Sequence, residues 1–147
     1  LDSVTSCFLI REPGEVLASY VKRRNNVRLE DLGFPQQSEI FRRTWDRTGT
    51  CPLVIDARDL LTNPEGMLRR LCDALGIEFC HSMLQWPAGP RDSDGVWAPY
   101  WYASVEASTG FAPWKARSRD YPPSLVSVVT AAQDFYDELY EHRLRIP

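Results

Sequence analysis

Two residues eight positions apart, Arg11 and Ser19, have the types and spacing to bind an anion. Arg11 directly follows the apolar run 7–10, and Ser19 lies within the amphipathic stretch that begins at Pro13. A guanidinium at the carboxyl end of a buried strand offers a planar fork of donors to a phosphate. A helix beginning at Pro13 adds free N–H groups and the positive end of its dipole. The pair predicts a phosphate site, although a strand-end salt bridge and a solvent-facing serine have the same spacing.

The elements that position this pair follow from the apolar pattern. Two short apolar runs, 6–10 and 52–56, predict parallel strands, and the unbroken first run predicts a strand covered on both faces. Helical periodicity marks four segments, at residues 13–21, 35–47, 64–75 and 124–143. Alternating strands and helices indicate an α/β layered fold with a short parallel sheet flanked by helices. Two strands are too few for such a sheet, so we expect residues 1–147 to be a single partial domain that lacks an N-terminal strand–loop–helix.

The helices at 64–75 and 35–47 have the clearest ends and faces. Asn63 is the expected N-cap of the helix at 64–75, Pro64 occupies its first position and Gly76 stops it. On the helix Pro35–Arg47, three residues are expected to face inward: Ile40, Phe41 and Trp45.

The segment Trp86–Pro123 has no strand or helix periodicity, yet it contains four of the five tryptophans. Long structureless loops are uncommon in compact domains, and aromatic residues argue against disorder. We therefore expect this segment to be ordered, with at least two of its tryptophans mostly buried. The rings either wall a pocket for a small organic ligand or pack over the core; they are Trp86, Trp97, Trp101 and Trp114.

Composition and charge exclude several classes of protein. The net charge of −3 gives no bulk attraction to nucleic acid or to an anionic membrane, so neither is expected as a partner. No apolar run reaches the roughly 18 residues of a membrane span, and the first residues, "LDSVTS", lack the basic start and apolar stretch of a signal peptide. The four cysteines form no CxxC pair and predict reduced thiols in a cytoplasmic protein.

Metal chemistry is not indicated by the sequence. His81 and His142, the two histidines, have no paired ligand at metal spacing and are interpreted as structural or solvated. The stretch "RDSDG" at 91–95 has two carboxylates two residues apart but lacks the later ligands of a calcium loop, so it predicts a turn.

Three segments resemble the sulfotransferase family. "IREPGEVLASY" is similar to its phosphate-binding segment, in which a strand ends in Arg, Pro comes two residues later and Ser eight residues later, matching Arg11, Pro13 and Ser19. "VIDARDLLTNPEGMLRRLCDALGIEF" is similar to the following strand, acidic turn and helix, with Asp59 and Pro64 in matching places. "WPAGPRDSDGVWAPYWYASVEASTGF" looks like a bacterial branch of sulfotransferase-like P-loop proteins.

The resemblance implies a fold, a donor and a reaction. The fold would be P-loop NTPase-like, and the donor 3′-phosphoadenosine 5′-phosphosulfate, with its 3′-phosphate held by Arg11 and Ser19. The sulfuryl group would pass to a hydroxyl or amine of a small-molecule acceptor. Sulfotransferases also close a late basic, glycine-containing loop over the 3′-phosphate, which makes Gly110 and Lys115 in "STGFAPWKARSR" candidates for cofactor binding.

The sequence also departs from the family pattern. No glycine-rich phosphate loop precedes Arg11, no catalytic base is recognised, and Ala57 stands where many members have an aromatic residue for the adenine. We therefore expect the 147-residue chain alone to be inactive and the complete protein to be a sulfotransferase. The alternatives are a non-catalytic nucleotide- or phosphate-binding module, or an interaction module of the same fold, and a P-loop enzyme resembling nucleotide kinases.

Overall fold

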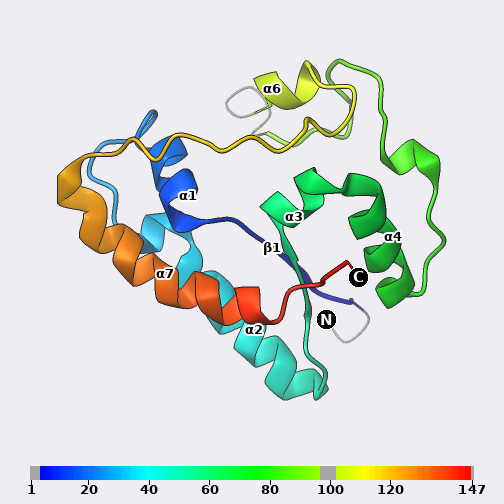
Figure 1. Ribbon diagram of the computed structural model, residues 1–147, viewed down its shortest axis with the longest axis horizontal. Helices are drawn as coiled ribbons and strands as arrows, with labels where there is room; N and C mark the ends of the chain where they lie inside the picture. The colour runs from blue at the N-terminus through cyan, green and yellow to red at the C-terminus, as the bar shows by residue number, and fades with distance from the viewer. Residues whose placement is uncertain (1–3, 97–101, 147) are drawn as a thin grey trace.

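The computed structural model describes residues 4–96 and 102–146. Two strand–helix units are followed by a long irregular segment and a last helix (Figure 1). The elements are β1 (Cys7–Ile10), α1 (Pro13–Tyr20), η1 (Leu29–Leu32), α2 (Phe34–Thr48), β2 (Leu53–Asp56), α3 (Ala57–Thr62), α4 (Pro64–Leu75), η2 (His81–Met83), α6 (Ala103–Glu106), η3 (Pro123–Leu125) and α7 (Val126–Glu141). None of the helices in this described part combines the length and apolarity needed to cross a membrane.

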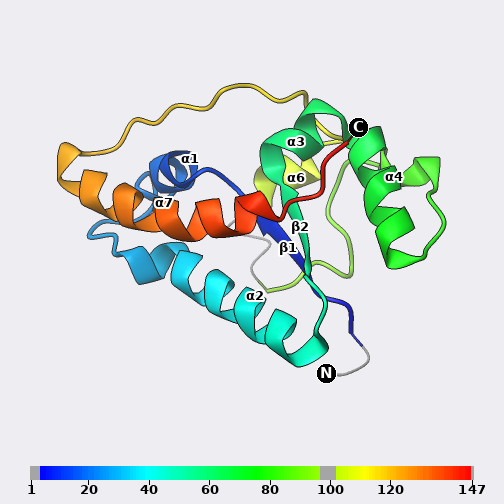
Figure 2. The same cartoon turned by 60° about the horizontal axis from the view of Figure 1, so that its bottom comes forward.

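The sheet consists of β1 and β2, which pair in parallel with Cys7 opposite Leu53 and Ile10 opposite Asp56. Both strands lie within one residue of their predicted bounds. In both views α1, α2 and α7 lie to one side of the sheet, and α3 and α4 to the other (Figures 1 and 2). The predicted α/β architecture, with a short parallel sheet flanked by helices, is therefore confirmed.

The hydrophobic core lies between the sheet and the helices α2 and α7. Its buried residues are Phe8, Ile10, Phe34, Phe41, Val54, Ala132, Tyr136 and Leu139. In β1 only the alternate residues Phe8 and Ile10 join this core, while Leu9 is 57% exposed. The expectation that β1 is covered on both faces was wrong, because successive strand side chains point to opposite faces and the helices bury only one of them.

Local end signals place most helices where they were predicted. Pro13 occupies the first turn of α1, and the Glu12 carboxylate caps the helix by accepting a hydrogen bond from the Glu15 N–H at 2.9 Å. In α4 the Asn63 side chain accepts from the Gly66 N–H at 2.9 Å, as expected of an N-cap. A short helix that the sequence pattern did not indicate, α3, precedes this cap.

The inward face of α2 differs from the prediction at one position. Phe41 is 1% exposed and Trp45 is partly buried, as expected, but Ile40 is 55% exposed. The buried positions 34, 38 and 41 and the partly buried position 45 recur every three or four residues and form one stripe. Ile40 lies about 100° around the helix from Phe41 and therefore leaves that stripe.

The segment Trp86–Pro123 contains α6 and an isolated antiparallel bridge between Gln85 and Gly110 at its start. Trp86 and Trp114 are partly buried, which agrees with the expected burial of two rings, and Trp97 and Trp101 lie outside the described residues. In the described parts of this segment, 86–96 and 102–123, tertiary contacts place residues whose structure local periodicity did not indicate.

A polar link joins α2 and α7 beside the core. Ser38, which is buried, donates a hydrogen bond to Glu138 at 2.6 Å, and Arg42 donates to the same carboxylate at 2.8 Å. Burial by itself would raise the pKa of Glu138, but the hydrogen bonds from Arg42 and Ser38 outweigh it and hold the pKa below its ordinary value.

This link predicts an acid-sensitive part of the stability. The contribution of Glu138 is present above the unfolded-state pKa of about 4.5 and is lost as the pH falls through the lower folded-state pKa. Glu138→Gln is expected to flatten this acid dependence in urea unfolding followed from neutral pH into acid. Glu39→Gln, whose ion pair with Arg43 is exposed, is the matched control. An unchanged pH profile in Glu138→Gln contradicts the role of the link.

Candidate functional site

A cavity of about 280 Å³ lies at the carboxyl ends of β1 and β2. We call it the arginine cavity. Its lining comprises four arginines, three carboxylates, three aromatic residues and one alanine: Arg11, Glu12, Glu15, Asp56, Arg58, Trp114, Ala116, Arg117, Arg119, Tyr136 and Tyr140. In open α/β folds this edge of the sheet is the usual place for a ligand.

Arg11 reaches the cavity from the residue directly after β1. Its side chain is half-buried, and within residues 4–96 and 102–146 it forms no hydrogen bond or ion pair. Burial lowers the pKa of Arg11, and the nearby Arg117 guanidinium lowers it further, while the charges of Glu15 and Asp56 act in the opposite direction. An anion bound by Arg11 and Arg117 would offset both the burial of the Arg11 charge and its repulsion by Arg117.

The roof of the cavity is an irregular segment, residues 111–122, that we call the strap. It runs from the region of α6 to the start of α7, past α1 (Figures 1 and 2). The backbone N–H of Trp114 donates to the Leu61 carbonyl at 3.2 Å. The Arg58 guanidinium lies 4.7 Å from the centre of the Trp114 ring. Further along, Arg119 forms an ion pair with Glu12 at 3.3 Å. These anchors bring Arg117 and Arg119 to the cavity.

The floor of the cavity is a buried hydrogen-bonded pair. Asp56, 2% exposed, accepts from the Tyr136 hydroxyl at 2.9 Å and from the Arg58 backbone N–H at 2.8 Å. Burial, together with the hydrogen bond to Asp56, strongly raises the pKa of Tyr136, so this hydroxyl stays protonated. The pair fixes the carboxyl end of β2 against α7 and the start of α3.

The charges of the lining leave an excess of cations for a ligand. Asp56 is engaged by Tyr136, and Glu12 by Arg119 and the Glu15 N–H. In the part of the chain that the structure describes, the charged lining groups without an ion-pair partner are three guanidiniums, Arg11, Arg58 and Arg117, and two carboxylates, Glu15 and Asp56, because the Tyr136 hydroxyl that binds Asp56 is neutral. This balance favours binding of a small anion.

The structure brings only one of the four sequence-predicted binding residues into this cavity. Arg11 lines it, whereas Ser19 is exposed on α1 and lies outside the lining. Lys115 is exposed on the strap between two lining residues. Gly110 lines a different pocket, where a Cβ atom would lie 3.0 Å from the Leu84 carbonyl oxygen, so close backbone approach explains the glycine.

Sequence reasoning missed Arg58, named Trp114 only as one of four rings that wall a pocket or pack over the core, and did not commit to Arg117 or Arg119. The signal for the last two was the run of cations at 115, 117 and 119. Which of these cations enters the cavity depends on where Trp114 docks, and α3, which carries Arg58, was not predicted.

The histidines and cysteines lie away from the arginine cavity. His142 packs its ring 5.6 Å from Phe41 and 4.9 Å from Trp45, and His81 packs 5.3 Å from Phe79. All four cysteines are free. Among the described residues, no three side chains of the His, Cys, Asp and Glu types gather as metal ligands.

Comparisons with known proteins identify the family. The sulfotransferase domain model matches residues 2–141. The "Branched-chain-amino-acid aminotransferase-like protein 1" of Arabidopsis thaliana is 43% identical over 91% of this chain and 24% of its own length. The "Branched-chain-amino-acid aminotransferase-like protein 2" of the same plant is 40% identical over 78% of this chain and 20% of its own.

The chain thus spans about a quarter or less of the curated relatives that it matches, so each name describes a much longer protein. No solved structure matches the chain. The family match agrees with the resemblance of the segment around Arg11. Because it extends over nearly the whole chain, this protein belongs to the sulfotransferase domain family.

Proposed function

We propose that this protein binds 3′-phosphoadenosine 5′-phosphosulfate and directs its sulfuryl group to a hydroxyl or amine of a small-molecule acceptor. The observation that carries the proposal is Arg11, a half-buried guanidinium without an ion-pair partner among the described residues, at the carboxyl end of β1. Membership of the sulfotransferase domain family supports this choice of donor over other anions.

The 3′-phosphate is the group of the donor that suits the arginine cavity. It is a compact dianion, and a guanidinium binds such a group through two parallel hydrogen bonds. Arg11 and Arg117 supply two of these forks, and the carboxylates of Asp56 and Glu12 are already engaged. Ser19, Gly110 and Lys115 remain predicted contributors outside the lining of the cavity.

The arginines of the cavity would bind and orient the donor. The described lining contains no histidine, and the Tyr136 hydroxyl is held by Asp56. The donor would supply an activated sulfuryl group: the acceptor atom would bond to sulfur as the bond from sulfur to the 5′-phosphate oxygen breaks, adenosine 3′,5′-bisphosphate would leave, and the acceptor proton would pass to solvent. Fixing the 3′-phosphate sets the register of the donor for that displacement, a contribution of positioning and electrostatics. The parallel strands and flanking helices support a P-loop NTPase-like fold.

The same lining also supports a second candidate, a phosphate-binding module without catalytic activity. What favours it is that the described lining contains no histidine and that two of its carboxylates, Glu12 and Asp56, are already bound by Arg119 and Tyr136. Both candidates predict nucleotide binding, and only the first predicts release of adenosine 3′,5′-bisphosphate from the donor in the presence of an acceptor.

Titration calorimetry with two isomeric nucleotides tests the binding proposal. Adenosine 3′-monophosphate is expected to bind at least about tenfold more tightly than adenosine 5′-monophosphate, because only the first places a phosphate at the 3′ position. Its affinity is also expected to fall as salt is added, since the contacts are ionic. Equal affinities for the two isomers, or binding of neither, would reject the arginine cavity as the 3′-phosphate site.

A further inference from the structure

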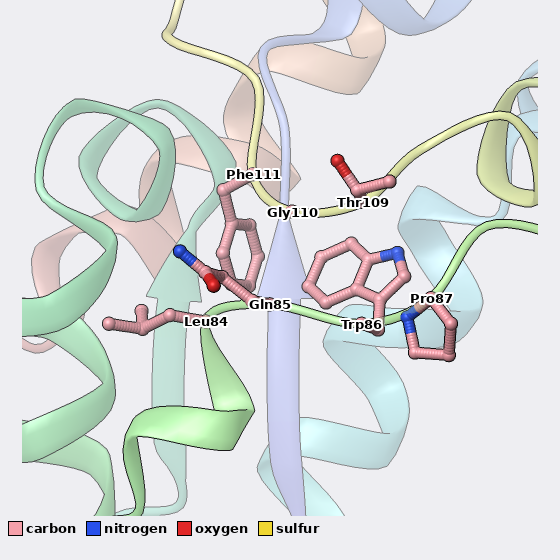
Figure 3. A pocket seen from close by; sticks show the side chains of 7 residues that line it. All are labelled: Leu84, Gln85, Trp86, Pro87, Thr109, Gly110 and Phe111. Atoms are coloured by element: carbon pink, nitrogen blue, oxygen red, sulfur yellow. The ribbon is translucent and has the colours of Figure 1, made fainter.

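A second pocket, of about 640 Å³, lies where the long segment folds back on itself. Residues 84–87 and 109–111 meet here through the Gln85–Gly110 bridge and a hydrogen bond from the Trp86 N–H to the Thr109 carbonyl at 3.1 Å. Figure 3 shows the Trp86 and Phe111 rings on either side of the Gly110 backbone. We call this surface, formed by 84–87 and 109–111, the aromatic ledge.

The ring of Trp86 is held in one orientation on the ledge. Its indole N–H donates to the Ser108 hydroxyl at 3.0 Å, and this hydroxyl donates to the Val105 carbonyl at 2.6 Å. The Phe111 ring packs edge-on against it, with centroids 5.3 Å apart and an interplanar angle of 85°. Both rings are only partly buried, so the ledge presents pre-oriented aromatic surface to a ligand.

The polar groups of the ledge are neutral. The side chains of Gln85 and Thr109 are exposed and form no hydrogen bond with any described residue, and none of the described lining residues is charged. An amide and a hydroxyl beside an aromatic face suit a ligand whose ring has an apolar C–H face and a rim of hydroxyls. An anionic ligand has no counter-charge here, in contrast to the arginine cavity.

The ledge and the arginine cavity belong to one continuous segment. The strap begins at Phe111 of the ledge, and Trp114, three residues later, lines the cavity. Three residues of extended chain span at most about 11 Å. The ledge and the cavity are therefore neighbouring sites along the strap.

We propose that the aromatic ledge binds the sulfuryl acceptor and that this acceptor is a neutral sugar ring, stacked on Trp86 with its hydroxyls on Gln85 and Thr109. That the sugar is the sulfuryl acceptor rests on the proposed function, whereas the sugar site itself rests only on the ledge. A sugar hydroxyl is the nucleophile that this placement offers to the donor.

Saturation-transfer NMR with methyl β-D-glucopyranoside tests the site directly. The ring protons of one sugar face are expected to receive saturation most strongly, with saturable binding that weakens about tenfold in Trp86→Ala and a few-fold in Gln85→Ala. Gln85 is exposed, so its variant reports on binding without disturbing the core, and Trp86→Phe keeps a ring for packing. Sorbitol and phenol are the matched probes that lack, respectively, the ring and the hydroxyl rim.

The outcomes separate this inference from the proposed function. Glycoside binding that is absent, or unchanged in both Trp86→Ala and Gln85→Ala, overturns the sugar site, as does phenol binding more tightly than the glycoside. If adenosine 3′-monophosphate still binds in that case, the donor site stands alone. If the protein binds the two nucleotide isomers equally, the donor assignment is rejected. If glycoside binding then survives in Arg11→Ala, the sugar site is kept.

Discussion

Arg11→Ala is expected to weaken binding of adenosine 3′-monophosphate by about 2–4 kcal/mol, the range for truncating one partner of a charged, hydrogen-bonded pair. Arg11 has no ion-pair partner among the described residues, so a phosphate in the cavity takes up its full bonding capacity. Binding of adenosine 5′-monophosphate is expected to change little. Calorimetry on wild type and variant, with both nucleotides at one salt concentration, gives the four affinities needed.

Three further variants sharpen this experiment. Arg11→Lys keeps the charge but loses the planar fork, so an intermediate loss is expected. Arg70→Ala, exposed on α4 and outside the cavity, controls for a general loss of positive charge. Ser19 keeps its predicted role only if Ser19→Ala costs about 1 kcal/mol, the value of one hydroxyl donor. If Arg11→Ala binds both nucleotides as wild type does, Arg11 is a strand-end cation and the donor assignment falls.

Phe41→Ala is expected to lower the free energy of unfolding by about 3–5 kcal/mol, as for large-to-small changes in a packed core. Phe41 is 1% exposed and packs edge-on against Phe8 of β1 at 5.5 Å and against Trp45 at 5.7 Å. Removing its ring leaves a cavity between α2 and the sheet. Urea unfolding followed by circular dichroism measures the loss.

The residue before it provides the control. Ile40 is 55% exposed, and Ile40→Ala is expected to change the free energy of unfolding by less than about 0.5 kcal/mol. Equal losses in the two variants would mean that Ile40, which the sequence pattern also placed inside, packs in the core. A small loss in Phe41→Ala would contradict the central position of its ring.

The sequence by itself determined the features that depend on neighbours a few residues apart. Pro13 after Glu12, and Asn63 before Pro64, start helices because side chains next to the first turn satisfy its free N–H groups. The apolar runs placed both strands to within one residue. The same local pattern placed Arg11 at the carboxyl end of β1, because Arg11 is the residue that directly follows the apolar run.

The faces of these elements were less accessible to sequence reasoning. Leu9 and Ile40 are as apolar as their buried neighbours, and the pattern alone gave no reason to expose them. Burial depends on which side of the element another element covers. In β1 the helices α2 and α7 cover the side of Phe8, and Leu9 points to the other side.

Only the tertiary structure decided the rest of the candidate site. Arg117 and Arg119 reach the cavity because the strap is anchored by Trp114 on α3 and by the ion pair with Glu12, contacts between residues more than a third of the chain apart. The aromatic ledge likewise needs Gln85 and Gly110 to meet. Such contacts depend on how distant segments pack, because neither partner has a preferred position by itself. The spacing of residues along the chain therefore does not predict them.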